Sequence, residues 1–307
     1  MAYLADDLLT DVRRSGMFPS SSAGATADAD LLAYADKEMQ TRLIPLLVSM
    51  REEWYSKVVD IPLVSGQAEY RLPKNAITGR TRLIQLLDPA TNALTNLERI
   101  EPGRTQELIG NQQGRPWAYF LRGAAVALFP PPADSTLKIR VTYLCRPGSL
   151  QLSSNCKAVA TASLSGGTWS LTTSGDLSTA ADCVAATPPF EALADGTVVR
   201  TGSATYTCAS GGVPSYGIAV GDWLCPANTS PVVQLPVELH GILTQRTVAR
   251  AKLAQGYQQE AAQLTADADK LLDEAMRLLT PRTEGEQRKI VGQLLWRNRR
   301  GFLGRGW

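Results

Sequence analysis

The longest continuous helical pattern in the chain runs from Pro236 to Leu279, and it constrains the fold more than any other stretch. A proline suits the first turn of a helix, where a missing N–H leaves no hydrogen bond unmade. Gly256 is the only weak position inside the pattern, at about 1 kcal/mol relative to alanine, and Pro281 ends it. At about 1.5 Å per residue we expect one helix of roughly 65 Å. Because a small domain does not need such a length, we expect a neighbouring molecule to cover part of it.

The second half of this helical stretch carries apolar residues at heptad spacing. Steps of four and three residues alternate along it, and large and small side chains also alternate, which is typical of a helix that packs closely against a neighbour. The seam consists of Tyr257, Ala261, Leu264, Ala268, Leu271, Ala275 and Leu278. We predict that this helix contributes to an interface between subunits.

The composition is that of an ordinary folded protein. The chain has 307 residues, a hydrophobic fraction of 44% and a formal net charge of +2. Attraction of the whole molecule to nucleic acid is therefore not expected, although a local charge asymmetry can survive the near-neutral total. No apolar run approaches the roughly 20 residues that cross a bilayer, and the first residues do not resemble a signal peptide. We expect no membrane partner.

Residue types that carry chemistry are scarce. The five cysteines have no C-x-x-C spacing and are expected to be small buried residues in a reducing compartment, with one disulfide in the middle of the chain as the alternative. The single histidine, His240, lies near a helix start, where a structural role is the usual one. The sequence contains no phosphate-binding loop and no nucleophile motif. We expect no enzyme activity, no catalytic or metal-binding residues, and no cofactor.

The chain divides into five segments, which together predict an α+β fold. The first segment has the spacing of amphipathic helices, with Pro45 expected to kink or split one of them. The second alternates apolar and polar residues between turns, as β-strands do. The third is rich in Ser, Thr, Gly and Ala, and its short alternating runs indicate an inserted β-barrel or sandwich. The long helix packs with the first segment as a helical body, and an extended tail follows. The expected boundaries are 1–58, 59–148, 149–235, 236–280 and 281–307.

The tail combines basic and aromatic residues, and after Glu286 it contains no acid. Disordered segments rarely carry many large apolar side chains, whereas tryptophan and arginine often anchor protein interfaces. We therefore expect the tail to become ordered on a partner, with a frayed terminus and a nucleic-acid contact as the alternatives. The candidate docking residues are Trp296, Arg297, Arg299, Arg300, Phe302, Leu303, Arg305 and Trp307.

A series of short motifs resembles those of tailed-bacteriophage head-to-tail adaptor proteins, which are also called head completion or neck proteins. Their order along the chain, together with the plan of helices, β-strands, helix and tail, extends the resemblance over most of the sequence. The motifs are Ala68–Pro73, Tyr143–Pro147, Ala186–Glu191, Val220–Trp223, Gln234–His240, Leu278–Arg282 and Asn298–Leu303.

The resemblance implies a structural protein of the virion neck that assembles in the host cytoplasm. Members of that group form a ring, usually dodecameric, below the portal protein, and a C-terminal extension reaches into the portal. The implied partners are the portal protein, further copies of the chain, tail or nozzle proteins, and genomic DNA that passes without sequence specificity through a channel lined by the helical body. The tail residues named above would then be the ones that dock on the portal.

Two other functional classes stay open on the sequence alone. A nucleic-acid-binding protein would use the basic tail to pair with phosphates. A glycan-binding or hydrolytic tail component would use aromatic residues of the inserted β module to stack on sugars, although core and turn positions are the commoner use of such residues. The candidates for stacking are Trp169, Tyr206, Tyr216 and Trp223.

Overall fold

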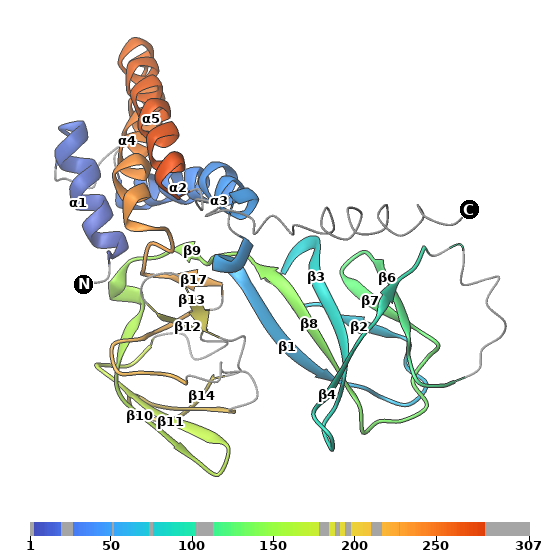
Figure 1. The fold of residues 1–307 in the computed structure, drawn as a ribbon. Coiled ribbons are helices and arrows are strands. Elements are labelled where there is room, and N and C mark those ends of the chain that lie inside the picture. Colours follow the sequence, from blue (N-terminus) through green and yellow to red (C-terminus); the bar gives the residue numbers. More distant parts are fainter. Residues whose placement is uncertain are drawn as a thin grey trace, which may run out of the picture.

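The computed structural model has a mixed α+β fold, as expected from the sequence, in which a helical body adjoins two separate β regions (Figure 1). The described residues are 3–19, 27–50, 52–73, 76–101, 103, 113–177, 184–187, 191–193, 198–209, 217–226 and 228–279. The predicted tail, residues 281–307, lies outside this part of the chain.

The N-terminal segment forms the first part of the helical body. Helix α1 carries two aspartates in its first turn and two arginines in its last, which suits the helix dipole. Helix α2 runs through a π-helical segment into α3, and Pro45 has no N–H to donate to that segment. The irregularity expected at Pro45 is therefore confirmed. The bounds are α1 (Ala5–Gly16), α2 (Asp28–Glu38), the π-helical segment (Met39–Leu43), α3 (Ile44–Met50) and a 3-10 turn (Glu52–Tyr55).

Two four-stranded sheets form the first β region. One has the order β1-β8-β3-β4 and is antiparallel, and the other has the order β2-β7-β6-β5 with one parallel pair, β5 and β6. Residues of both sheets, among them Ile84, Val126 and Ile139, share one apolar core. The strands are β1 (Ser56–Pro62), β2 (Glu69–Arg71), β3 (Ala76–Asp88), β4 (Ala93–Asn96), β5 (Glu98–Arg99), β6 (Ala118–Arg122), β7 (Ala125–Phe129) and β8 (Lys138–Cys145).

The inserted segment forms a β module, as expected, built from one curled seven-stranded sheet. Its order is β13-β12-β16-β10-β11-β15-β14, and every neighbouring pair is antiparallel. A small core of its own includes Leu171, Tyr206 and Leu224. The strands are β10 (Lys157–Ser165), β11 (Thr168–Thr173), β12 (Val184–Thr187), β13 (Glu191–Leu193), β14 (Val198–Gly202), β15 (Thr205–Ala209) and β16 (Trp223–Cys225).

The base of this module belongs to the helical body. β9 (Ser149–Leu150) and β17 (Thr229–Ser230) form a parallel pair, and the chain after β17 hydrogen-bonds to the N-terminal segment, where the Val233 N–H donates to the Tyr3 carbonyl across 3.0 Å. Leu150 and Leu235 lie in the helical core. The separately packed part of the module therefore runs from β10 to β16, inside the expected range of 149–235.

The expected single helix from Pro236 is wrong, because the chain forms a helical hairpin. α4 (Val237–Ala254) and α5 (Gln258–Leu279) lie side by side (Figure 1). Gly256 adopts a φ of +91°, its N–H bonds the Leu253 carbonyl, and the Tyr257 N–H bonds the Lys252 carbonyl, each at 3.0 Å. This is the hydrogen-bond pattern of a glycine-capped helix end. Because two shorter helices pack against each other, residues 236–279 do not form a single helix of roughly 65 Å that a neighbouring molecule would have to cover.

Candidate docking surfaces

The seven residues of the predicted seam separate onto two faces of the hairpin. Ala261, Ala268 and Ala275 are buried in the chain's own helical core, and Leu264 packs against that core. The exposed members are Tyr257, Leu271 and Leu278, whose exposed fractions are 53%, 41% and 77%.

This separation has a geometric reason. A straight helix drifts by about 20° per heptad relative to a strict 3.5-residue repeat, so the buried face follows the helical period instead. It includes Leu272 and Leu279, which the seam did not contain. A role of the seam in binding a second subunit therefore stays a prediction, and it now concerns the exposed members.

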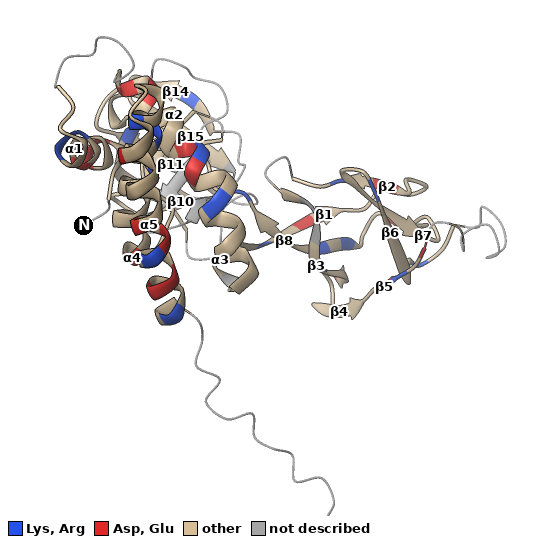
Figure 2. Cartoon of the chain, turned by 90° about the horizontal axis from the view of Figure 1, so that it is seen from above, with Lys and Arg blue, Asp and Glu red and all other residues tan. Residues whose placement is uncertain are grey.

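The exposed leucines of α5 alternate with acids along one stripe. Asp267, Leu271, Glu274 and Leu278, which we call the α5 stripe, are spaced by four, three and four residues and so share one face of the helix. All four side chains are exposed. The whole of α5 contains five acids and two bases, and Figure 2 shows acidic residues recurring along the hairpin. This face offers a partner both apolar area and negative charge.

A buried group of charges holds the hairpin on α2. Glu38, at the end of α2, faces Arg246 and Arg250 of α4, and its Oε2 lies 3.5 Å from Arg246 Nη1. Arg246 also pairs with Asp269 of α5. Apart from these ion pairs, Glu38 Oε2 and the Arg246 Nε have no hydrogen-bond partner among the described residues. Sequence reasoning missed this group, because its members lie far apart in the chain and meet only after the helices pack.

The tip of the helical body carries a second apolar group. Lys252 Nζ lies 5.0 Å from the centre of the Tyr257 ring and 5.7 Å from that of Phe18, and pairs with Glu260 across 3.2 Å. Met17, next to Phe18 at the end of α1, is almost fully exposed. Lys252 thus contacts both the α4–α5 turn and the end of α1 through cation–π interactions. These contacts stabilise the packing of the hairpin against α1.

His240 has a structural environment. Its ring stacks on Tyr3 with centroids 4.4 Å apart and planes inclined by 15°, and its Nε2 lies 2.9 Å from the Leu235 carbonyl oxygen. Burial lowers the pKa of His240 below its ordinary value. The Tyr3 hydroxyl donates to Asp11 across 2.7 Å. These contacts secure the start of the chain against α4.

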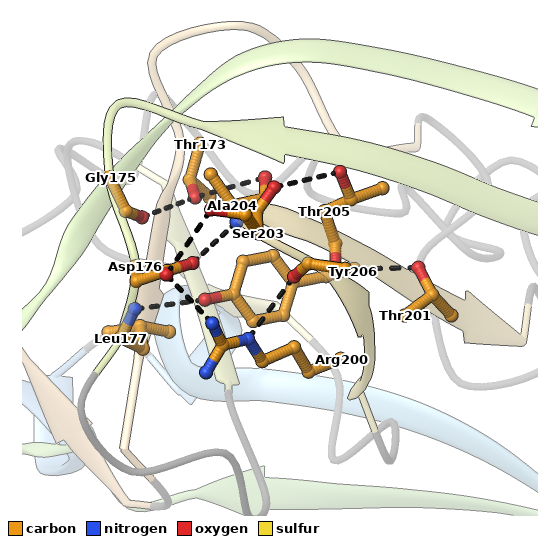
Figure 3. A network of polar contacts seen from close by, with 11 residues as sticks. Thr173, Gly175, Asp176, Leu177, Arg200, Thr201, Ser203, Ala204, Thr205 and Tyr206 are labelled. Atoms are coloured by element: carbon orange, nitrogen blue, oxygen red, sulfur yellow. Dashed lines mark hydrogen bonds and ion pairs between the residues drawn. The ribbon is translucent and has the colours of Figure 1, made fainter.

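The polar network of the module is also structural (Figure 3). Asp176, in the loop after β11, accepts hydrogen bonds from Arg200, Ser203 and the Ala204 N–H. The Leu177 N–H donates to the Tyr206 hydroxyl across 2.9 Å. The network ties the loop to the β14–β15 turn, where Ala204 has a φ of +53°.

The aromatic residues considered for sugar stacking do not form one exposed platform. Tyr206 is fully buried, and Trp169 is half-buried with its ring over Gly217, whose added Cβ would lie 2.6 Å from the ring. Trp223 is half-buried in β16, and Tyr216 lies outside the described residues. The module therefore lacks, within its described part, the open aromatic surface that a sugar would need.

The structure also places most of the cysteines but not the docking residues of the tail. Cys145, Cys156, Cys208 and Cys225 are buried, as expected, and burial raises the pKa of the Cys208 thiol. The described residues contain no group of three or more metal ligands and no helix long and apolar enough to span a bilayer. The docking residues from Trp296 to Trp307, together with Cys183, lie outside the described part of the chain, so the tail assignment stays a prediction.

The comparisons with known proteins identify the family. No curated protein matches the chain. The SU10 adaptor protein family matches residues 3–182, a stretch that includes the N-terminal helices, the first β region and the first strands of the module. Because this match spans more than half of the 307 residues, the chain belongs to the SU10 adaptor protein family, a family of phage head-to-tail adaptors.

Proposed function

We propose that the chain is a structural protein of the virion neck that forms a dodecameric ring below the portal protein. In this proposal the tail docks on the portal, the helical body lines the DNA channel, and the other side of the ring receives tail or nozzle proteins. The ring assembles in the host cytoplasm. Membership of an adaptor family supports the structural role, and the contacts of His240 give no support to catalysis.

The exposed leucines of α5 are the observation that best supports a ring. Leu271 and Leu278 lie on one face of the hairpin and are open to solvent, and apolar area that is contiguous on a folded surface is typical of interaction sites. A ring of identical subunits repeats each contact around its circumference. Modest single contacts then add up to a stable assembly.

The charge of α5 supports a place near the DNA. The helix contains five acids and two bases, and two of the acids pair with bases of α4. The negative charge that remains repels the phosphate backbone of DNA. A channel wall of this sign would let DNA slide past without holding it. The tail, in contrast, has the arginine and tryptophan content of a protein-docking segment.

The test of this proposal is ring formation on purified portal protein. Leu271→Asp combined with Leu278→Asp places charges on the exposed face without touching the core, and we expect negative-stain images to lose the adaptor ring. Leu264 is left intact because it packs inside the chain. The matched control is Leu164→Asp, an exposed leucine on the module, which should still form rings. Rings formed by the double variant would show that the face has no part in assembly.

A further inference from the structure

The α5 stripe has the composition of a surface that binds a basic and apolar segment. Its two leucines are open to solvent, and its two acids border them on the same face. The exposed bases Lys270 and Arg277 lie beside the stripe on one side, but the stripe itself carries only acids. An apolar surface that carries one sign of charge favours a partner of the opposite sign through electrostatic complementarity.

The acids of the stripe keep negative charge available for a partner. Asp269, on another face of α5, is paired with the buried Arg246, and Glu260 is paired with Lys252. Asp267 meets Lys270 across 3.3 Å, but both side chains are mostly exposed, and such pairs are weak. Glu274 has no ion pair within the described residues. The stripe therefore offers one uncompensated carboxylate and a second that is weakly held.

The chain itself contains a segment of complementary chemistry directly after α5. From residue 288 to residue 305 it has six basic residues and no acid. Large apolar side chains accompany them, at Ile290, Leu294, Leu295, Trp296, Phe302 and Leu303. Glycines at 292, 301 and 304 interrupt this segment. Because a segment of 18 residues is too short to form a hydrophobic core of its own, these side chains need another surface to cover them.

The connection is long enough for the segment to reach the stripe. Eight residues, 280–287, separate the end of α5 from the basic segment, and an extended chain of that length reaches about 26 Å. The stripe runs eleven residues back from Leu278 to Asp267, or about 17 Å along the helix. Pro281 stops the helix, and Gly285 favours a reversal of the chain.

We propose that, in the free chain, the tail folds back along α5 and binds the α5 stripe. Tail arginines face Asp267 and Glu274, and tail apolar side chains cover Leu271 and Leu278. This contact concerns the free chain, so it goes beyond the proposed function and holds whether or not the tail docks on a portal. One consequence does rest on the proposed function: docking of the tail on the portal uncovers the stripe for a neighbouring copy, so that ring formation follows docking.

Hydrogen–deuterium exchange of the full-length chain, read by mass spectrometry, tests the contact. We expect the amides of residues 288–303 to exchange at least about tenfold more slowly than those of a synthetic peptide of the same residues. Glu274→Gln should remove most of this protection. The matched control is Asp273→Asn, which neutralises the adjacent exposed acid off the stripe and should keep it.

A charge-swap experiment distinguishes a direct contact between tail and stripe from a general destabilisation of α5, because only a direct contact is restored when both charges are reversed. Glu274→Arg should abolish protection, and adding Arg297→Glu, Arg299→Glu and Arg300→Glu to it should restore protection in part. Protection should also be independent of protein concentration over about a tenfold range, because the contact lies within one chain.

Three results would overturn the inference. They are equal effects of Glu274→Gln and Asp273→Asn, wild-type exchange as fast as that of the peptide, and protection that appears only together with dimers. Portal docking of the same variants is measured separately. A tail that is unprotected but still docks would contradict the fold-back contact and leave the proposed function standing.

Discussion

Glu38 of α2 and Arg246 of α4 form an ion pair in which Glu38 Oε2 lies 3.5 Å from Arg246 Nη1, and their side chains are only 5% and 4% exposed. The pair joins an N-terminal helix to the C-terminal hairpin across more than two hundred residues of sequence. Helices from both ends of the chain thus share one core, as the sequence predicts.

Removing the charge of Glu38 should therefore destabilise the helical body. In Glu38→Gln the buried Arg246 keeps only Asp269 as an ion-pair partner. Loss of one member of a buried pair typically lowers the free energy of unfolding by about 3–5 kcal/mol. Asp269→Asn, whose side chain is 53% exposed, should lower it by about 1 kcal/mol or less. Urea unfolding with an unchanged m-value measures both. Equal losses would mean that burial of the pair does not matter.

The stacking of Tyr3 on His240 predicts a pH dependence. Burial lowers the pKa of His240, so below about pH 6.5 the unfolded chain binds a proton that the folded chain resists. The free energy of unfolding then falls as the pH falls. His240→Gln keeps an N–H donor for the Leu235 carbonyl but does not titrate. We expect the loss of stability between about pH 7.5 and about pH 5.5 to be smaller in this variant than in the wild type. Identical losses in urea unfolding would exclude a contribution from His240.

The module should be removable at its base. Ala158 and Trp223 are cross-strand partners in the antiparallel pair of β10 and β16, so an Asn-Gly turn in place of residues 159–222 can join them. We expect circular dichroism to retain the helical signal and its cooperative unfolding. A longer deletion, 149–230, also removes Leu150 from the helical core and should destabilise the helices by at least about 2 kcal/mol. Unfolded helices in the shorter deletion would refute the boundary at β10 and β16.

The tail should be necessary for docking on the portal. A chain that ends after Pro281 should stay folded but fail to bind portal rings, and Arg297→Gln, Arg299→Gln and Arg300→Gln together should weaken binding by at least about tenfold. The control variant, Arg288→Gln with Lys289→Gln, removes charge outside the predicted docking residues and should bind nearly normally. Moderate salt should weaken binding only in part, because apolar contacts are not screened. Complete loss in salt, with recovery of binding on any duplex DNA, would instead identify a phosphate-binding tail.

Local patterns in the sequence predict most of the fold. The period of the N-terminal helices, the irregularity at Pro45 and the alternation along β8 follow from spacing alone, and the structure confirms them. The α4–α5 turn does not follow from the local pattern, because Gly256 is compatible with a weak position inside one long helix. A glycine after Lys252 and Leu253 also suits a helix cap, and only the tertiary contacts of the hairpin decide between the two.

The candidate surfaces are less predictable than the fold. A heptad spacing does not distinguish apolar residues that face the chain's own core from those that face solvent. Ala268 and Leu278 both fit the predicted seam, although Ala268 is buried and Leu278 is exposed. The Glu38–Arg246 pair depends on the packing of α2 against α4, which no local pattern encodes. The tail remains a prediction from composition, since residues 281–307 lie outside the described part of the chain.

The most direct test of the adaptor proposal is the mass of the complex that full-length wild-type chain forms with purified portal rings, measured by native mass spectrometry. We expect about twelve copies of the chain per portal ring, bound as a complete set with few partial occupancies, because subunit contacts and tail docking reinforce each other. Copies that bind independently, with a broad distribution of occupancies, or no binding to the portal at all, would contradict the proposal.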